Sequence, residues 1–206
     1  LAEEGLKYLV LRFGTWKHEA FNFTYRANVD ALAERGMVTF FSPLHDAVLP
    51  PCNLLYLLGG YPELFAAELS ANATMRRQIK DYAEHGGRVL AECGGFMYLC
   101  SDIDGTEMCG VLPFKATMDG AQLHLGYRKL MLGGTLMRGH EFHYSTVVEP
   151  DTLPPDVVRI TGQCSASGKA VDTPLYRYKQ VIAGYTHWYW AENGAFLDYQ
   201  TFRLTD

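Results

Sequence analysis

The stretch RVLAECGGFMYL, residues 88–99, joins a strand-like apolar run to a cysteine, two glycines and a helix-like run. A strand that turns sharply into a helix at a nucleophile needs small residues there, because the backbone is crowded. The N–H groups that open the helix would point at the sulfur of Cys93, and this favours the reactive thiolate. The same pattern suits a packed thiol, because free cysteine is among the most buried residue types. From this stretch alone, Cys93 is as readily a core residue as a nucleophile.

Strand-like and helix-like segments alternate through the first half of the chain. Strands are expected at residues 7–13, 37–41, 54–58 and 88–92. Helices are expected over 28–35, from Pro62 onward, and over 73–85 with Asn72 as the N-cap. Such alternation is typical of βαβ units, so we expect an α/β domain with a mostly parallel sheet.

The second half has a β-rich pattern. Alternating segments around Gly133-Gly134 predict a hairpin, and residues 164–178 are small, polar and turn-rich. Residues 180–190 are expected to form a strand that runs into a loop, and residues 191–204 a closing helix. We therefore treat residues 1–206 as one α/β domain with β-rich elaboration.

Composition excludes several classes of function. The chain has 206 residues, of which 48% are hydrophobic, which suits one domain with a sizeable core. Its net charge of −5 provides no basic field for nucleic acid or an anionic membrane, and no apolar run approaches a membrane span of about 20 residues. Five scattered cysteines without a signal peptide indicate reduced thiols in the cytoplasm.

Two further motifs offer partners for a cysteine nucleophile. His187 follows the apolar strand VIAGY, whose carboxyl end would meet the crevice of an open α/β sheet. The turn LLGGYPEL would direct the N–H of Gly60 to that edge, where an oxyanion donor is needed beside the N–H of Gly94. Taken singly, a packed histidine and an ordinary βα turn explain these motifs at least as well.

A metal site is not expected. The motif GHEFHYS, residues 139–145, has the spacing H-E-x-H, which on a strand places His140 and His143 on opposite faces. The zinc-binding pattern on a helix is H-E-x-x-H. We therefore assign no metal ligands.

Taken together, the motifs GGYPEL, AECGGFMYL and GHEFHYS resemble the glutamine amidotransferase domain of the cobyrinate a,c-diamide synthase family. The resemblance spans nearly the whole chain in the family's order. It implies a flavodoxin-like, three-layer class I amidotransferase fold. It also implies that a cysteine attacks the side-chain amide of glutamine and releases ammonia.

The resemblance assigns roles to individual residues. Cys93 matches the nucleophile, His187 the histidine that raises its nucleophilicity, and Gly60 and Gly94 the oxyanion hole. Glu141, His143 and Tyr189 are expected to line the substrate site. Class I enzymes usually carry a glutamate two residues after the histidine, and this chain has Tyr189 there, so a Cys–His dyad is the expectation.

The resemblance also implies partners. An N-terminal synthetase domain, which would use ATP and Mg²⁺ to activate the a and c carboxylates of cobyrinic acid, has no counterpart in the 206 residues. The start at Leu1 suggests a C-terminal fragment, which would itself hold no cofactor, and a homodimer is possible. Cobyric acid synthase, nickel-sirohydrochlorin diamide synthase, a PfpI-type cysteine hydrolase and a silent binding module are the alternatives.

Overall fold

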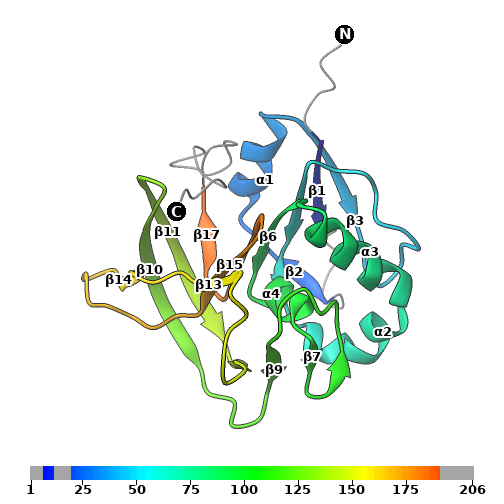
Figure 1. The fold of residues 1–206 in the computed structure, drawn as a ribbon. Coiled ribbons are helices and arrows are strands. Elements are labelled where there is room, and N and C mark those ends of the chain that lie inside the picture. Colours follow the sequence, from blue (N-terminus) through cyan, green and yellow to red (C-terminus); the bar gives the residue numbers. More distant parts are fainter. Residues whose placement is uncertain (1–6, 12–19, 191–206) are drawn as a thin grey trace.

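The computed structural model describes residues 7–11 and 20–190, and in this part of the chain a seven-stranded sheet forms the centre of the molecule (Figure 1). Its order is β13-β15-β16-β6-β4-β1-β3, and the five strands from β16 to β3 are mutually parallel. The strands are β1 (Lys7–Leu11), β3 (Met37–Phe41), β4 (Leu54–Leu57), β6 (Arg88–Glu92), β13 (Val157–Arg159), β15 (Leu175–Tyr178) and β16 (Val181–Gly184). The central strands β4, β6 and β16 are almost wholly buried and, apart from the two charged ends of β6, apolar, as expected for a parallel sheet covered on both faces.

Short helices connect the parallel strands. They are α1 (Arg26–Ala33), the 3₁₀ helix η1 (Pro62–Phe65), α2 (Ala66–Ala71), α3 (Ala73–Glu84) and α4 (Gly94–Leu99). Pro62 opens η1, and the Asn72 side chain accepts a hydrogen bond from the Met75 N–H at the start of α3. Every residue of α4 is buried, so α4 lies within the core.

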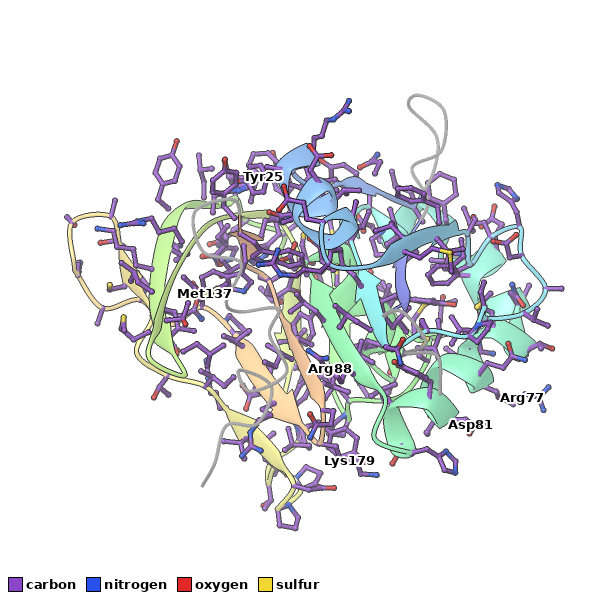
Figure 2. The ribbon with its side chains drawn as sticks, turned by 90° about the horizontal axis from the view of Figure 1, so that it is seen from above. Tyr25, Arg77, Asp81, Arg88, Met137 and Lys179 are labelled. Carbon is purple, nitrogen blue, oxygen red and sulfur yellow. The ribbon has the colours of Figure 1, made fainter. Side chains whose placement is uncertain are left out.

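A second, antiparallel sheet stands beside the central one. Its order is β14-β10-β11-β17, and the long hairpin β10–β11 forms its body. Figure 1 shows the hairpin on the side of the molecule opposite β3 and α3, and Figure 2 shows Met137 of β11 far from Arg77 and Asp81 of α3. The strands are β10 (His124–Leu132), β11 (Thr135–His143), β14 (Cys164–Ser165) and β17 (His187–Tyr189).

Two small sheets complete the described residues. One is β12-β9-β7-β8, and the other pairs β2 with β5. Their strands are β2 (Phe21–Phe23), β5 (Gly59–Gly60), β7 (Asp102–Ile103), β8 (Thr106–Glu107), β9 (Lys115–Thr117) and β12 (Thr146–Val148). Because β5 pairs with β2, the Gly-Gly turn after β4 is held as extended backbone.

The expected α/β class, the mostly parallel sheet and the hairpin at Gly133-Gly134 are confirmed. The expectation for residues 180–190 was wrong in part: the strand ends at Gly184, and His187 begins a new strand, β17, paired with β11 in the other sheet. The description of residues 164–178 as turn-rich missed β15, which pairs with β16. Its sequence, LYRY, is too short and too polar to be recognised as a strand. The expected helix over 191–204 lies outside the described residues. No helix among those described is both long and apolar enough to cross a membrane.

Candidate active site

Cys93 occupies a sharp turn between β6 and α4. Its φ of 48° and ψ of −108° lie in a region that residues with a side chain rarely adopt, at a cost of about 1–3 kcal/mol. The turn is held from both sides, because the Cys93 N–H donates to the Gly184 oxygen at 2.8 Å and its carbonyl accepts from the Met97 N–H at 3.0 Å. The observed backbone is that of a nucleophile elbow.

The two glycines after Cys93 are required by close packing. A Cβ at Gly94 would lie 2.8 Å from the Gly60 oxygen, and one at Gly95 would lie 2.4 Å from the Leu57 oxygen. The start of α4 therefore rests directly on the backbone of β4 and β5. This contact brings the N–H groups of Gly60 and Gly94 together beside the sulfur.

Burial controls the protonation state of Cys93. It raises the pKa of the thiol to about 12, although hydrogen bonding by the backbone N–H groups of Gly60 and Gly94 lowers it in part. The N–H groups act in the expected direction, toward thiolate, but removal of the thiol from water outweighs them in the free site. The same two N–H groups are placed to bind negative charge that develops beside the sulfur.

His187 lies deep in the same region, on β17. Its ring stacks on His140 with centroids 4.8 Å apart and meets the edge of Phe23 at 4.6 Å. Burial, reinforced by His140 and His143, lowers the pKa of His187 to about 3, so the imidazole is neutral in the free site. Among the described residues its buried Nδ1 has no hydrogen-bond partner.

Gly59 explains how the imidazole fits. A Cβ at Gly59 would lie 2.1 Å from Cε1 of His187, so only glycine leaves space for the ring. A Cβ at Gly60 would lie 2.2 Å from the Ala20 oxygen. Each position therefore requires glycine for a different steric reason: residue 59 leaves space for the His187 ring, and residue 60 allows the β2–β5 contact.

A cavity of about 330 Å³ joins these groups. Cys93, His187 and Gly60 all line it, together with Glu63 and His140. Glu63 is the single carboxylate among the described lining residues, and burial raises its pKa. The described wall of this small cavity thus holds a thiol, a neutral imidazole and one acid among apolar side chains.

The three residues expected to line the substrate site have different positions. His143 lines the cavity and stacks on Tyr185 at 3.6 Å. Glu141 is buried elsewhere, bound to Arg128, and is not among the described lining residues. Tyr189 is also not among them, and its ring packs edge to face on Tyr25 at 5.1 Å.

Glu141 belongs to a hydrogen-bonded cluster behind the cavity. Its carboxylate accepts from His143 Nε2 at 2.7 Å and from Thr173 Oγ1 at 2.8 Å, and it pairs with the Arg128 guanidinium. Although burial acts to raise it, these partners lower the pKa of Glu141 to about 2. His124 completes a group in which three ligand-type atoms lie within 4.8 Å of one another. Both oxygens of Glu141 and both ring nitrogens of His143 are hydrogen-bonded or ion-paired within the protein.

Sequence reasoning missed several residues at the site. His140 was set aside with the metal motif, yet it stacks on His187 and its Nδ1 lies 2.5 Å from the Tyr25 hydroxyl, beside α1 (Figure 2). Glu63 was quoted only as part of GGYPEL. The one available signal was that an acid follows the Gly-Gly turn by three residues.

An elbow cysteine at the carboxyl end of a parallel sheet, with two N–H donors and a histidine in the same region, fits the class I glutamine amidotransferase fold. Among solved structures, PurLQS from Thermotoga maritima is similar over 89% of this chain and 87% of that chain, with a TM-score of 0.59 and 17% identity. A crystal structure of a glutamine amidotransferase is similar over 90% of this chain and 92% of that chain, with a TM-score of 0.55 and 17% identity. The chain belongs to the CobB/CobQ-like glutamine amidotransferase domain family, whose model matches residues 13–195.

Curated relatives of the chain belong to one branch of this family, the a,c-diamide synthases. The chain is 45% identical over 67% of its length to cobyrinate a,c-diamide synthase of Methanothermobacter thermautotrophicus, covering 33% of that protein. It is 40% identical over 84% of its length to hydrogenobyrinate a,c-diamide synthase of Streptomyces coelicolor, covering 36% of that protein. The chain therefore spans about a third of the length of these relatives. Their names favour the a,c-diamide synthase branch over the alternatives raised by the sequence.

Proposed function

We propose that this domain hydrolyses glutamine through a Cys93 thioester and that the ammonia amidates the a and c carboxylates of a cobyrinate-type corrin. The carrying observation is that Cys93 and a neutral His187 line one cavity with the Gly60 and Gly94 N–H groups at the sulfur. A buried thiol is a poor nucleophile until a base accepts its proton. The neutral imidazole of His187 supplies that base.

The chemistry follows from these positions. The sulfur of Cys93 attacks Cδ of glutamine while His187 accepts the thiol proton, and the amide oxygen becomes an oxyanion held by the N–H groups of Gly60 and Gly94. His187 then returns the proton to the amide nitrogen, the C–N bond breaks and ammonia leaves. Water, activated by the same imidazole, hydrolyses the γ-glutamyl thioester to glutamate and regenerates the thiol. One oxyanion donor is typically worth about 2.7–4 kcal/mol of the barrier.

Glu63 is our candidate for recognition of the substrate's amino acid end. Glutamine carries an α-ammonium group, and an ammonium leaving water is favoured by an anionic partner. Glu63 is the carboxylate of the described cavity wall, and Cys93 lines the same cavity. We expect the α-ammonium to bind Glu63 while the side-chain amide reaches Cys93.

The remaining steps belong to a larger protein. The matched region covers only about a third of each relative named above, which supports an N-terminal synthetase domain as the partner. We propose that the N-terminal synthetase domain uses ATP and Mg²⁺ to activate corrin carboxylates. We also propose that the protein acts in the cytoplasm, as a homodimer. The relatives differ in substrate name, so cobyrinate and hydrogenobyrinate should both be tested.

The test is glutamate release from glutamine by the full-length protein, with and without ATP and each corrin. Cys93→Ala should reduce the release to background and prevent labelling by a chloroketone analogue of glutamine. Glutamate release by Cys93→Ala at the wild-type rate would refute the proposal.

Glu63→Gln should raise KM for glutamine at least about tenfold, because a charge-assisted hydrogen bond is worth roughly 1.5–3 kcal/mol, while kcat changes little. The matched control is Glu68→Gln, at an exposed position on α2, which should leave both constants unchanged. An unchanged KM in Glu63→Gln would remove Glu63 from the binding site.

A further inference from the structure

The strand that carries His187 has an open edge. β17 is the last strand of the sheet β14-β10-β11-β17, and Figure 1 shows it between the hairpin and the central sheet. Trp188 lies opposite Gly139 of β11, and its backbone N–H and carbonyl groups are bonded away from that strand. Backbone groups on a buried edge need partners, and here the partners are side chains.

Asn28 replaces the neighbouring strand. Its Nδ2 donates to the Trp188 oxygen at 2.7 Å, and its Oδ1 accepts from the Trp190 N–H at 2.9 Å. A carbonyl and an N–H two residues apart are what the backbone of a paired β-strand would bind. Asn28 is fully buried on α1, so a side chain of this helix binds the backbone directly after His187.

Glu92 binds a second backbone group of this strand, the Trp188 N–H. Its Oε1 accepts from the Trp188 N–H at 3.1 Å, and its Oε2 accepts from the Tyr56 hydroxyl at 2.7 Å. The carboxyl group is 1% exposed. Because Glu92 directly precedes Cys93, one side chain links the residue before the nucleophile to the residue after the base.

The side chain of His187 itself lacks such support, since its buried Nδ1 has no hydrogen-bond partner among the described residues. Tyr189, two residues after His187, packs its ring on Tyr25. We propose that Glu92 and Asn28 are positioning residues, which orient His187 toward Cys93 by fixing the backbone of β17 rather than by bonding the imidazole. This inference rests on the proposed glutaminase function.

A displacement of about 1 Å in a catalytic group can cost about 100-fold in rate. Loss of Asn28 frees two backbone groups directly after His187, so Asn28→Ala should lower kcat for glutamine hydrolysis at least about tenfold. KM should change less than about threefold, because Asn28 is not among the described residues that line the cavity. Asp30→Ala, at an exposed position on the same helix, is the matched control and should retain wild-type kinetics.

A double-mutant cycle separates positioning from general disruption. If Asn28 acts through His187, adding Asn28→Ala to a His187→Ala protein should cost less than about twofold. The cycle is run in the full-length protein, as glutamate release and as the rate at which a chloroketone analogue of glutamine labels Cys93. The labelling rate can be followed by mass spectrometry in variants too slow for turnover.

Three outcomes decide between the hypotheses. A tenfold loss in the wild-type background and none in the His187→Ala background supports positioning. Equal losses in both backgrounds overturn it and leave the glutaminase function intact, whereas absence of Cys93-dependent turnover in the wild type refutes the function itself.

Two further variants guard against misfolding. Should Asn28→Ala fail to fold, Asn28→Asp takes its place, since it keeps the acceptor for Trp190 and loses the donor to Trp188. Glu92→Gln retains an acceptor for the Trp188 N–H, so it should be at least about tenfold faster than Glu92→Ala. Equal rates for Glu92→Gln and Glu92→Ala would contradict the role of Glu92.

Discussion

At the scale of single residues, the fit between Gly59 and His187 is decisive for the site. The imidazole lies where a side chain at residue 59 would be, and Gly60 separately meets the backbone of Ala20. The Gly-Gly pair is therefore needed for steric reasons before any oxyanion is considered. The first glycine admits the base, and the second presents an N–H group to the sulfur.

We expect Gly59→Ala to reduce kcat for glutamine hydrolysis about 100-fold, because its Cβ would lie 2.1 Å from the imidazole and the ring must move. The measurement is steady-state glutamate release together with thermal unfolding. Gly105→Ala is the control for a general loss of stability, since Gly105, unlike Gly59, has a positive φ that strains an alanine, while its Cβ would meet nothing within 4 Å. A Gly59→Ala protein with activity within about threefold of wild type would show that the imidazole has room to adapt.

At the scale of elements, helix α3 is anchored by one asparagine. The Asn72 side chain accepts from the Met75 N–H at 3.2 Å and donates to the carbonyls of Pro43 and Asp46 at 2.8 and 2.9 Å. It thereby caps the helix and binds the loop that follows β3. The N-cap was expected from the sequence, but the link to the loop depends on how the two segments pack.

Asn72→Ala should lower the free energy of unfolding by about 2 kcal/mol, since it removes the cap and both loop contacts. Asn72→Asp keeps the cap acceptor and loses the two donors, so it should cost about 1 kcal/mol. Urea unfolding followed by circular dichroism measures both, and glutamine turnover should be unaffected. Equal costs for the two variants would mean that the loop contacts contribute nothing.

At the scale of the whole molecule, a carboxyl group lies at the centre of the core. Burial raises the pKa of Glu92 to about 8, and the hydrogen bonds from Tyr56 and Trp188 lower it only in part. The unfolded chain would show the ordinary value of 4.5. Between these values the folded protein binds more protons than the unfolded one, so stability falls as pH rises through this window.

Glu92→Gln has no such proton to lose. Relative to the variant, the wild-type protein should therefore lose on the order of 3 kcal/mol of unfolding free energy between pH 5 and pH 8. Urea titrations of both proteins at a series of pH values measure the difference, in which the contributions of other groups cancel. Parallel curves for the two proteins would show that Glu92 ionises normally in the fold.

The local sequence was sufficient to predict the elbow, the Gly-Gly turn, the capped helix and the hairpin. In each of these, small residues, a cap or strict alternation restrict the backbone over a few neighbours. Cys93, Gly60 and Gly94 lie together in the structure because the glycines that permit the two turns also permit close contact between the turns. The catalytic roles themselves stay predictions until the variants are assayed.

Only the tertiary structure decided where His187 lies, how it is held and which charges the site carries. The strand β17 forms by pairing with β11, some 50 residues away, and by the side chains of Asn28 and Glu92, more than 90 residues away. The same packing turned Glu141 away from the cavity toward Arg128 and raised the pKa of Cys93 by burial. The sequence by itself determined which local turns were possible, because steric limits act between neighbours. Burial and long-range pairing determined the chemistry, because they depend on segments that only folding brings together.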